Sequence, residues 1–175
     1  TVQEKIADAA QVHRFTGLAP AVALHIPWDR VDDYAALARY AADQGVSLGT
    51  INSNTFQDEE YKFGSLTHAD PGVRRKAIDH HLECLEIMNA TGSRDLKIWL
   101  ADGTNYAGQQ DMRGRQDRLA ESLAEIYSNL RLQLPQLRRR RPDCRSRRPV
   151  PALPDHGRGG ARRRAQPGKR RGLHA

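Results

Sequence analysis

A histidine follows a short apolar segment near the start of the chain, and its position suits chemistry. The segment AVALHIP covers residues 21–27, and His25 lies just before the Pro27 that ends it. An imidazole at the end of a buried strand can hold a water or a ligand oxygen, and it can move protons near neutral pH. A hydrogen-bonded structural histidine is the alternative interpretation, and spacing alone favours that alternative.

Three further side chains could bind a metal. His80, His81 and Cys84 lie close together in the sequence, with His80 and Cys84 four residues apart in a predicted helix. Zinc normally takes four ligands, and no second Cys/His pair lies at a supporting spacing. We therefore interpret this segment as a mostly solvated helix surface. The segment from Gly103 to Gly108 matches neither GxxxxGK[ST] nor GxGxxG, so a turn between strand and helix is a better interpretation than a phosphate loop.

The elements that would position these side chains alternate along the chain. Helices are predicted at about 3–14, from Asp32 or Asp33 to Gly45, between the N-cap Asp70 and Gly92, and at about 113–130. Strands are predicted at 21–27, 46–51 and 95–102. This order predicts an α/β fold with a parallel sheet and right-handed crossovers. Such sheets bind their ligands at the carboxyl ends of the strands.

The chain contains two regions of different composition. Residues 1–130 hold 13 basic and 19 acidic residues, whereas residues 131–175 hold 15 basic and 2 acidic residues and 6 of the 9 prolines. The second region has few large apolar residues, so we expect a disordered Arg/Pro-rich tail. Arg, Pro, Gly and Ala have GC-rich codons, and an out-of-frame reading of a GC-rich gene would explain the tail. The alternative is an arm that binds polyanions such as nucleic acid in a salt-dependent way, although it lacks interleaved aromatic residues.

Composition also excludes several classes of protein. The apolar runs are far shorter than the roughly 18 residues that a membrane span needs. The N-terminus lacks the basic-then-apolar order of a signal peptide. The chain has two cysteines, Cys84 and Cys144, which do not form a disulfide framework. These features predict a cytoplasmic protein with no membrane partner.

Five segments of the first region occur in an order that is typical of one enzyme family: LHIPWDR (24–30), INSNTF (51–56), YKFGSLTH (61–68), AIDHHLECLEI (77–87) and LKIWLADGTNYAGQ (96–109). Through these segments, residues 17–130 resemble the bacterial L-rhamnose isomerase family, in the branch of broad sugar specificity. The resemblance implies a (β/α)₈ TIM barrel that interconverts an aldose and a ketose with a divalent metal, usually manganese. Because a closed barrel takes about 250 residues, we expect only a partial TIM barrel of about three βα units over 1–130. Such an arc would leave sheet edges unburied, which favours association between copies.

The resemblance also implies roles for individual residues. His25 matches the active-site histidine associated with ring opening and water placement. Phe56 and Trp99 match apolar contacts to the substrate, whereas the residues alone permit a loop anchor for Phe56 and a core aromatic for Trp99. The metal ligands of the family lie on strands that would follow Leu130, and the tail shows no such pattern. We therefore expect no metal ligands and no turnover in this chain, although the intact relatives are metal-dependent homo-oligomers that act on small sugars.

Overall fold

The computed structural model describes residues 1–103 and 107–133, which all lie in one compact unit, Thr1–Arg140. The helices are α1 (Val2–Thr16), α2 (Tyr34–Asp43), α3 (Pro71–Thr91) and α4 (Met112–Gln133). The strands are β1 (Ala21–His25), β2 (Ser47–Asn52) and β3 (Asp95–Lys97), and two short 3-10 helices lie at Glu59–Phe63 and Ala107–Gln109. The tail is predicted to begin at residue 131, whereas α4 continues to Gln133. The rest of the predicted tail, on which the expected polyanion binding depends, lies outside the described residues.

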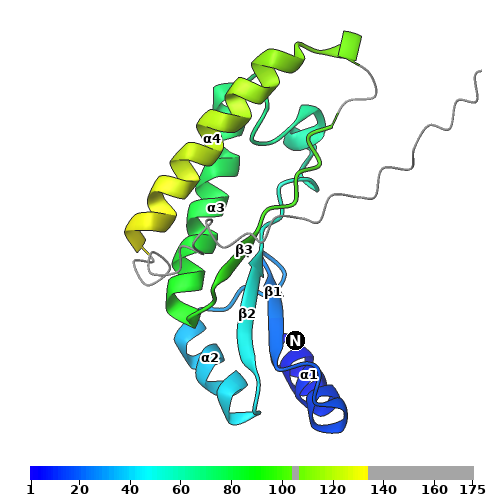
Figure 1. Ribbon diagram of the computed structural model, residues 1–175, viewed down its shortest axis with the longest axis vertical. Helices are drawn as coiled ribbons and strands as arrows, with labels where there is room; N and C mark the ends of the chain where they lie inside the picture. Colours follow the sequence, from blue (N-terminus) through cyan, green and yellow to red (C-terminus); the bar gives the residue numbers. More distant parts are fainter. Residues whose placement is uncertain (104–106, 134–175) are drawn as a thin grey trace, which may run out of the picture. The chain divides into compact units, whose positions relative to one another are not determined.

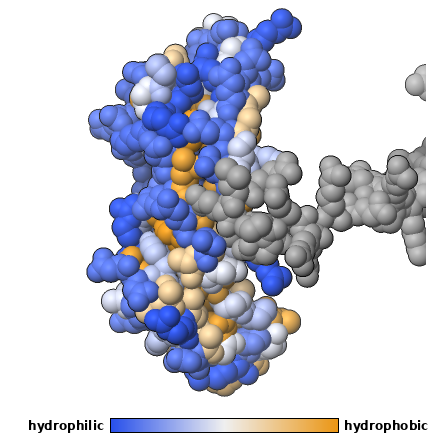
Figure 2. All heavy atoms as spheres, turned by 90° about the vertical axis from the view of Figure 1, so that its left-hand side faces the viewer, coloured by the Kyte–Doolittle hydropathy of each residue, from blue (hydrophilic) through white to orange (hydrophobic). Residues whose placement is uncertain are grey.

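The three strands form a parallel sheet in the order β1-β2-β3. Figure 1 shows α2 and α3 along one side of the sheet, α1 beside β1, and α4 against α3. The predicted α/β class with three βα units is therefore confirmed. The helical side is largely hydrophilic, with hydrophobic residues gathered in a narrow band (Figure 2). None of the described helices is long and apolar enough to cross a membrane.

The core lies between the sheet and its helices. Leu24 of β1 and Ile51 of β2 are fully buried and pair with one another across the two strands. Leu85 and Met88 of α3 are fully buried in the same cluster. Because side chains of a strand alternate between its two faces, the neighbours of Leu24 and Ile51 face away from these helices.

Local sequence explains the helix ends. Asp70 caps α3 by accepting a hydrogen bond from the Gly72 amide at 2.7 Å, and Pro71 occupies the first turn, as predicted. Gly92 ends α3 with φ +71°, a left-handed conformation in which a Cβ would be strained. Asp33 caps α2 through the Ala36 amide at 2.8 Å.

The third strand is shorter than predicted. The sequence predicts a strand over 95–102, whereas β3 covers only Asp95–Lys97. The Ser53 amide donates to the Lys97 carbonyl at 3.1 Å, and after this bond the chain that follows β2 turns toward α3. Residues after Lys97 therefore have no residue of β2 to pair with, and β3 ends at Lys97.

Two adjacent histidines of α3 hold that turn. The Ser53 hydroxyl lies 3.0 Å from His81 Nε2, and the Asn54 amide donates to His80 Nε2 at 3.0 Å. His81 Nδ1 lies 2.7 Å from the Ala77 carbonyl, so Nδ1 carries the proton and Nε2 accepts from Ser53. His81 is fully buried, and burial lowers its pKa to about 4. The expectation of a mostly solvated helix surface is wrong here, because these histidines satisfy polar groups of the neighbouring turn.

Asp102 anchors the segment that follows β3. Its carboxylate accepts hydrogen bonds from the amides and hydroxyls of Ser65 and Thr67, at 2.7–2.9 Å. Its carbonyl accepts from the Arg115 guanidinium of α4. Residues 98–101 are therefore held between the end of β3 and the loop at 65–67.

The buried His81 should make stability depend on pH. Its folded-state pKa of about 4 lies below the ordinary value of 6.5, so the unfolded chain takes up the proton first. This contribution to the free energy of unfolding is fully present above pH 6.5 and is lost as pH falls toward 4, by at most about 3 kcal/mol. Denaturant unfolding at several pH values should show this slope, and His81→Gln should flatten it. Equal slopes in both proteins would contradict the assignment.

The four hydrogen bonds to Asp102 should matter for stability. Asp102→Asn replaces one acceptor oxygen by an amide that faces N–H donors, so we expect the free energy of unfolding to fall by about 2 kcal/mol. Asp95→Asn is the matched control, because Asp95 is exposed in β3 and its carboxylate has no hydrogen-bond partner among the described residues. Urea denaturation measures the free energy of unfolding of both variants. An equal decrease in the two variants would contradict a stabilising role of the Asp102 hydrogen bonds.

Candidate functional site

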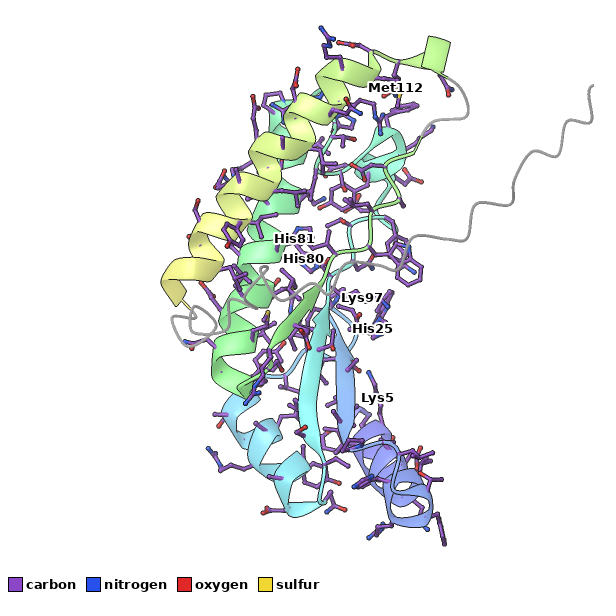
Figure 3. The ribbon with its side chains drawn as sticks, in the orientation of Figure 1. Lys5, His25, His80, His81, Lys97 and Met112 are labelled. Carbon is purple, nitrogen blue, oxygen red and sulfur yellow. The ribbon has the colours of Figure 1, made fainter. Side chains whose placement is uncertain are left out.

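The last residues of the three strands form a row across the sheet. His25 pairs with Asn52, and Asn52 pairs with Lys97. Partners in register on parallel strands point to the same face, and here it is the face opposite Leu24 and Ile51. Figure 3 shows His25 and Lys97 at the ends of the strands and His80 and His81 along α3. The row therefore lies at the carboxyl edge, where parallel α/β sheets bind ligands.

The backbone of His25 is fixed while its ring is free. Its amide donates to Asp29 Oδ2 at 2.7 Å, and the Asp29 amide returns a bond to the His25 carbonyl at 2.8 Å. Asp29 is buried and its carboxylate also pairs with Lys5 of α1. Neither ring nitrogen of His25 has a hydrogen-bond partner within residues 1–103 and 107–133, so the alternative of a hydrogen-bonded structural histidine lacks the bonds that it needs.

Asn52 is the buried centre of the row. Its side-chain amide nitrogen donates to the Leu24 carbonyl at 3.1 Å, which ties β2 to β1 beside His25. The bond fixes the orientation of the amide group, because the nitrogen is the donor and the Asn52 oxygen then points away from Leu24. Asn52 thus presents a fixed polar group between two more exposed side chains.

Aromatic rings border the row. The rings of Phe56 and Trp99 lie 5.8 Å apart at their centroids and are tilted by 44°. They are 38% and 54% exposed, so the interpretation of Trp99 as a core aromatic is wrong for the described part of the chain. Trp28 is also exposed, and its ring centroid lies 6.1 Å from that of His25. The structure thus brings the rings of Phe56 and Trp99 together, and it places the ring of Trp28 beside that of His25.

Sequence reasoning missed two members of the row, Asn52 and Lys97. The Lys97 ammonium lies 5.7 Å from the centroid of the Trp99 ring, within the range of a cation–π contact. The sequence carried no sufficient signal for them, because the predicted strands cover 46–51 and 95–102 and so do not end at Asn52 or Lys97. Their alignment with His25 depends on the register between strands, which is a property of the fold.

The described residues do not fit a divalent metal. Within 1–103 and 107–133, no group of three or more His, Cys, Asp and Glu side chains could hold an ion. His80 and His81 spend their Nε2 atoms on the turn after β2, and Asp102 accepts four hydrogen bonds. Cys84 is buried 4.0 Å from His80, and burial raises the pKa of its thiol to about 12. The thiol is therefore neutral and unreactive at pH 7.

Comparison with known proteins relates this arrangement to sugar-converting enzymes. No protein-family model matches the chain. It is 43% identical over 132 residues to a probable sugar isomerase of Rhizobium meliloti and 41% identical over 132 residues to one of Mesorhizobium japonicum. These matches cover 73% of this chain in both cases, but 31% and 30% of the relatives. An L-rhamnose isomerase of Rhodopirellula baltica is 31% identical over 104 residues, which are 56% of this chain and 24% of that protein.

A solved structure gives the architecture. The D-psicose 3-epimerase of Clostridium cellulolyticum H10, crystallised with D-tagatose, matches with a TM-score of 0.58 at 17% identity. The match covers 76% of this chain and 44% of the epimerase, whose fold is a TIM barrel. The chain spans less than a third of the curated sugar isomerases that it matches. The chain thus has the fold of a partial TIM barrel, and its sequence is similar to those of probable bacterial sugar isomerases.

Proposed function

We propose that this chain forms one wall of the sugar site of an aldose–ketose isomerase of the L-rhamnose isomerase type, which converts L-rhamnose to L-rhamnulose. The observation that carries the proposal is the row at the carboxyl edge. There the imidazole of His25, whose nitrogens have no hydrogen-bond partner among the described residues, lies near exposed aromatic rings. Similarity to sugar isomerases supports the general reaction, and the match to an L-rhamnose isomerase supports this sugar.

His25 would act on the sugar ring before isomerisation. Its imidazole accepts the proton of the anomeric hydroxyl while the bond between C1 and the ring oxygen breaks. The ring oxygen would take its proton from a bridging water, and the protonated imidazole would return its proton to that water, so that His25 is neutral again when the open-chain sugar has formed. The reciprocal bonds between His25 and Asp29 keep the backbone in place, so the ring can contact the sugar without reorganisation of the strand.

Phe56 and Trp99 would hold the apolar side of the sugar. Sugars present C–H groups on one side of the ring, and aromatic rings pack against such surfaces. The two exposed rings lie 5.8 Å apart at their centroids, so together they would offer one aromatic surface to the sugar. Packing there would turn the hydroxyl groups toward the polar row.

We expect this chain alone not to turn over L-rhamnose. The resemblance implies a divalent metal, and the described residues offer no ligand cluster for one. Purified chain should form no L-rhamnulose from L-rhamnose when manganese is present, as measured by a ketose assay. A related full-length sugar isomerase provides the positive control. Manganese-dependent formation of L-rhamnulose that His25→Asn abolishes would contradict the expectation.

The sugar-binding wall should be detectable without turnover. L-rhamnose added to ¹⁵N-labelled chain should shift the indole N–H signal of Trp99, because the sugar packs on this exposed ring. Trp99→Ala should weaken binding by about tenfold, as expected for loss of an aromatic contact of about 1.4 kcal/mol. Phe15→Ala is the matched control, since Phe15 is exposed on α1 away from the row. Equal affinity of Trp99→Ala and the unaltered chain would argue against this wall.

A further inference from the structure

Lys62 and Lys97 are the two lysines within residues 1–103 and 107–133 that form no ion pair, and of these two Lys97 lies in the row. Lys5 pairs with Asp29, and Lys76 pairs with Asp58 and Glu60. Lys97 has no acidic partner within residues 1–103 and 107–133, and its ammonium contacts only the Trp99 ring. A cation–π contact uses the face of the ring and leaves N–H donors of the ammonium free. These donors are available to a ligand.

The backbone of Lys97 is fixed although its side chain is exposed. The Lys97 carbonyl accepts a hydrogen bond from the Ser53 amide at 3.1 Å, and the Ser53 hydroxyl lies 3.4 Å from the same carbonyl. Ser53 in turn is held by the buried His81. The position from which the Lys97 side chain starts is therefore set by the core of the protein.

Register places Lys97 at a useful distance from His25. The two residues lie on the same face with β2 between them, so their Cα atoms are about 10 Å apart at ordinary strand spacing. Side chains that extend from both positions can reach a single small ligand between them. Asn52 lies between His25 and Lys97 in the register of the sheet, and the Trp99 ring lies beside the Lys97 ammonium.

We propose that Lys97 is a further substrate-contacting residue, which donates hydrogen bonds from its ammonium to sugar hydroxyls while Trp99 packs against the C–H face. The inference rests on the proposed sugar site and assigns it a specificity-determining cation. Sugar hydroxyls are good acceptors, and a donor that carries charge makes the stronger hydrogen bonds. Asp95, two residues earlier on the same face, is the nearest acidic group along β3, and it forms no ion pair with Lys97.

Substitutions at Lys97 test the proposal through binding. Lys97→Met removes the ammonium but keeps a long side chain against Trp99, and Lys97→Arg keeps the charge. L-rhamnose is titrated into each full chain and followed by the NMR signals of the Trp99 indole and of the His25 and Asn52 amides. We expect Lys97→Met to bind about tenfold more weakly, and Lys97→Arg to bind within about threefold of the unaltered chain.

Lys62 provides a matched control. Its ammonium lies 5.4 Å from the Phe63 ring centroid, so Lys62→Met removes the same kind of cation–π contact outside the row. Lys62→Met should bind L-rhamnose as the unaltered chain does. Equal affinity of Lys97→Met and the unaltered chain would overturn the role of Lys97 and leave the proposed sugar site intact. No binding by the unaltered chain would overturn both.

Discussion

The hydrogen bond between Ser53 and the buried His81 connects the core of this protein to its candidate site. It joins the middle of α3 to the residue that follows β2, and the same serine pairs with Lys97 at the end of β3. The imidazole must be neutral to accept this bond, and its burial favours that state. The carboxyl edge of the sheet is thus fixed by a polar contact within an otherwise apolar core, and the row of His25, Asn52 and Lys97 follows from it.

Three histidines show how position decides what one residue type does. His80 and His81 both accept hydrogen bonds from the turn after β2 and have no capacity left on Nε2 for a ligand. The backbone of His25 is held by Asp29, and its ring nitrogens have no hydrogen-bond partner in the part of the chain that the structure describes. Spacing along the chain favoured a solvated helix surface for the adjacent pair and a hydrogen-bonded structural role for His25. The contacts instead give the pair a structural role, and they favour His25 as the residue for chemistry.

Much of the fold could be predicted from the sequence, because its local signals are strong. Asp70, Pro71 and Gly92 mark both ends of α3, and the alternation of strands and helices predicts the parallel sheet. The length of β3 could not be predicted, since it depends on where the neighbouring strand turns away. The same limit applies to the site. His25, Phe56 and Trp99 were named from family resemblance, but pairing across strands adds Asn52 and Lys97, which no local pattern marks.

The exposed side chains at the edge have a consequence for how such a protein can change over evolution. Phe56, Trp99 and Lys97 contribute little to the apolar core, and the backbone of Lys97 is held by the buried Ser53. Replacing them therefore costs little folding free energy, and the scaffold can tolerate many combinations at these positions. Selection can then explore new ligand preferences one residue at a time without first compensating for a damaged fold. The carboxyl edge of the sheet can therefore evolve readily, because its exposed side chains can be replaced while the buried core that supports them stays the same.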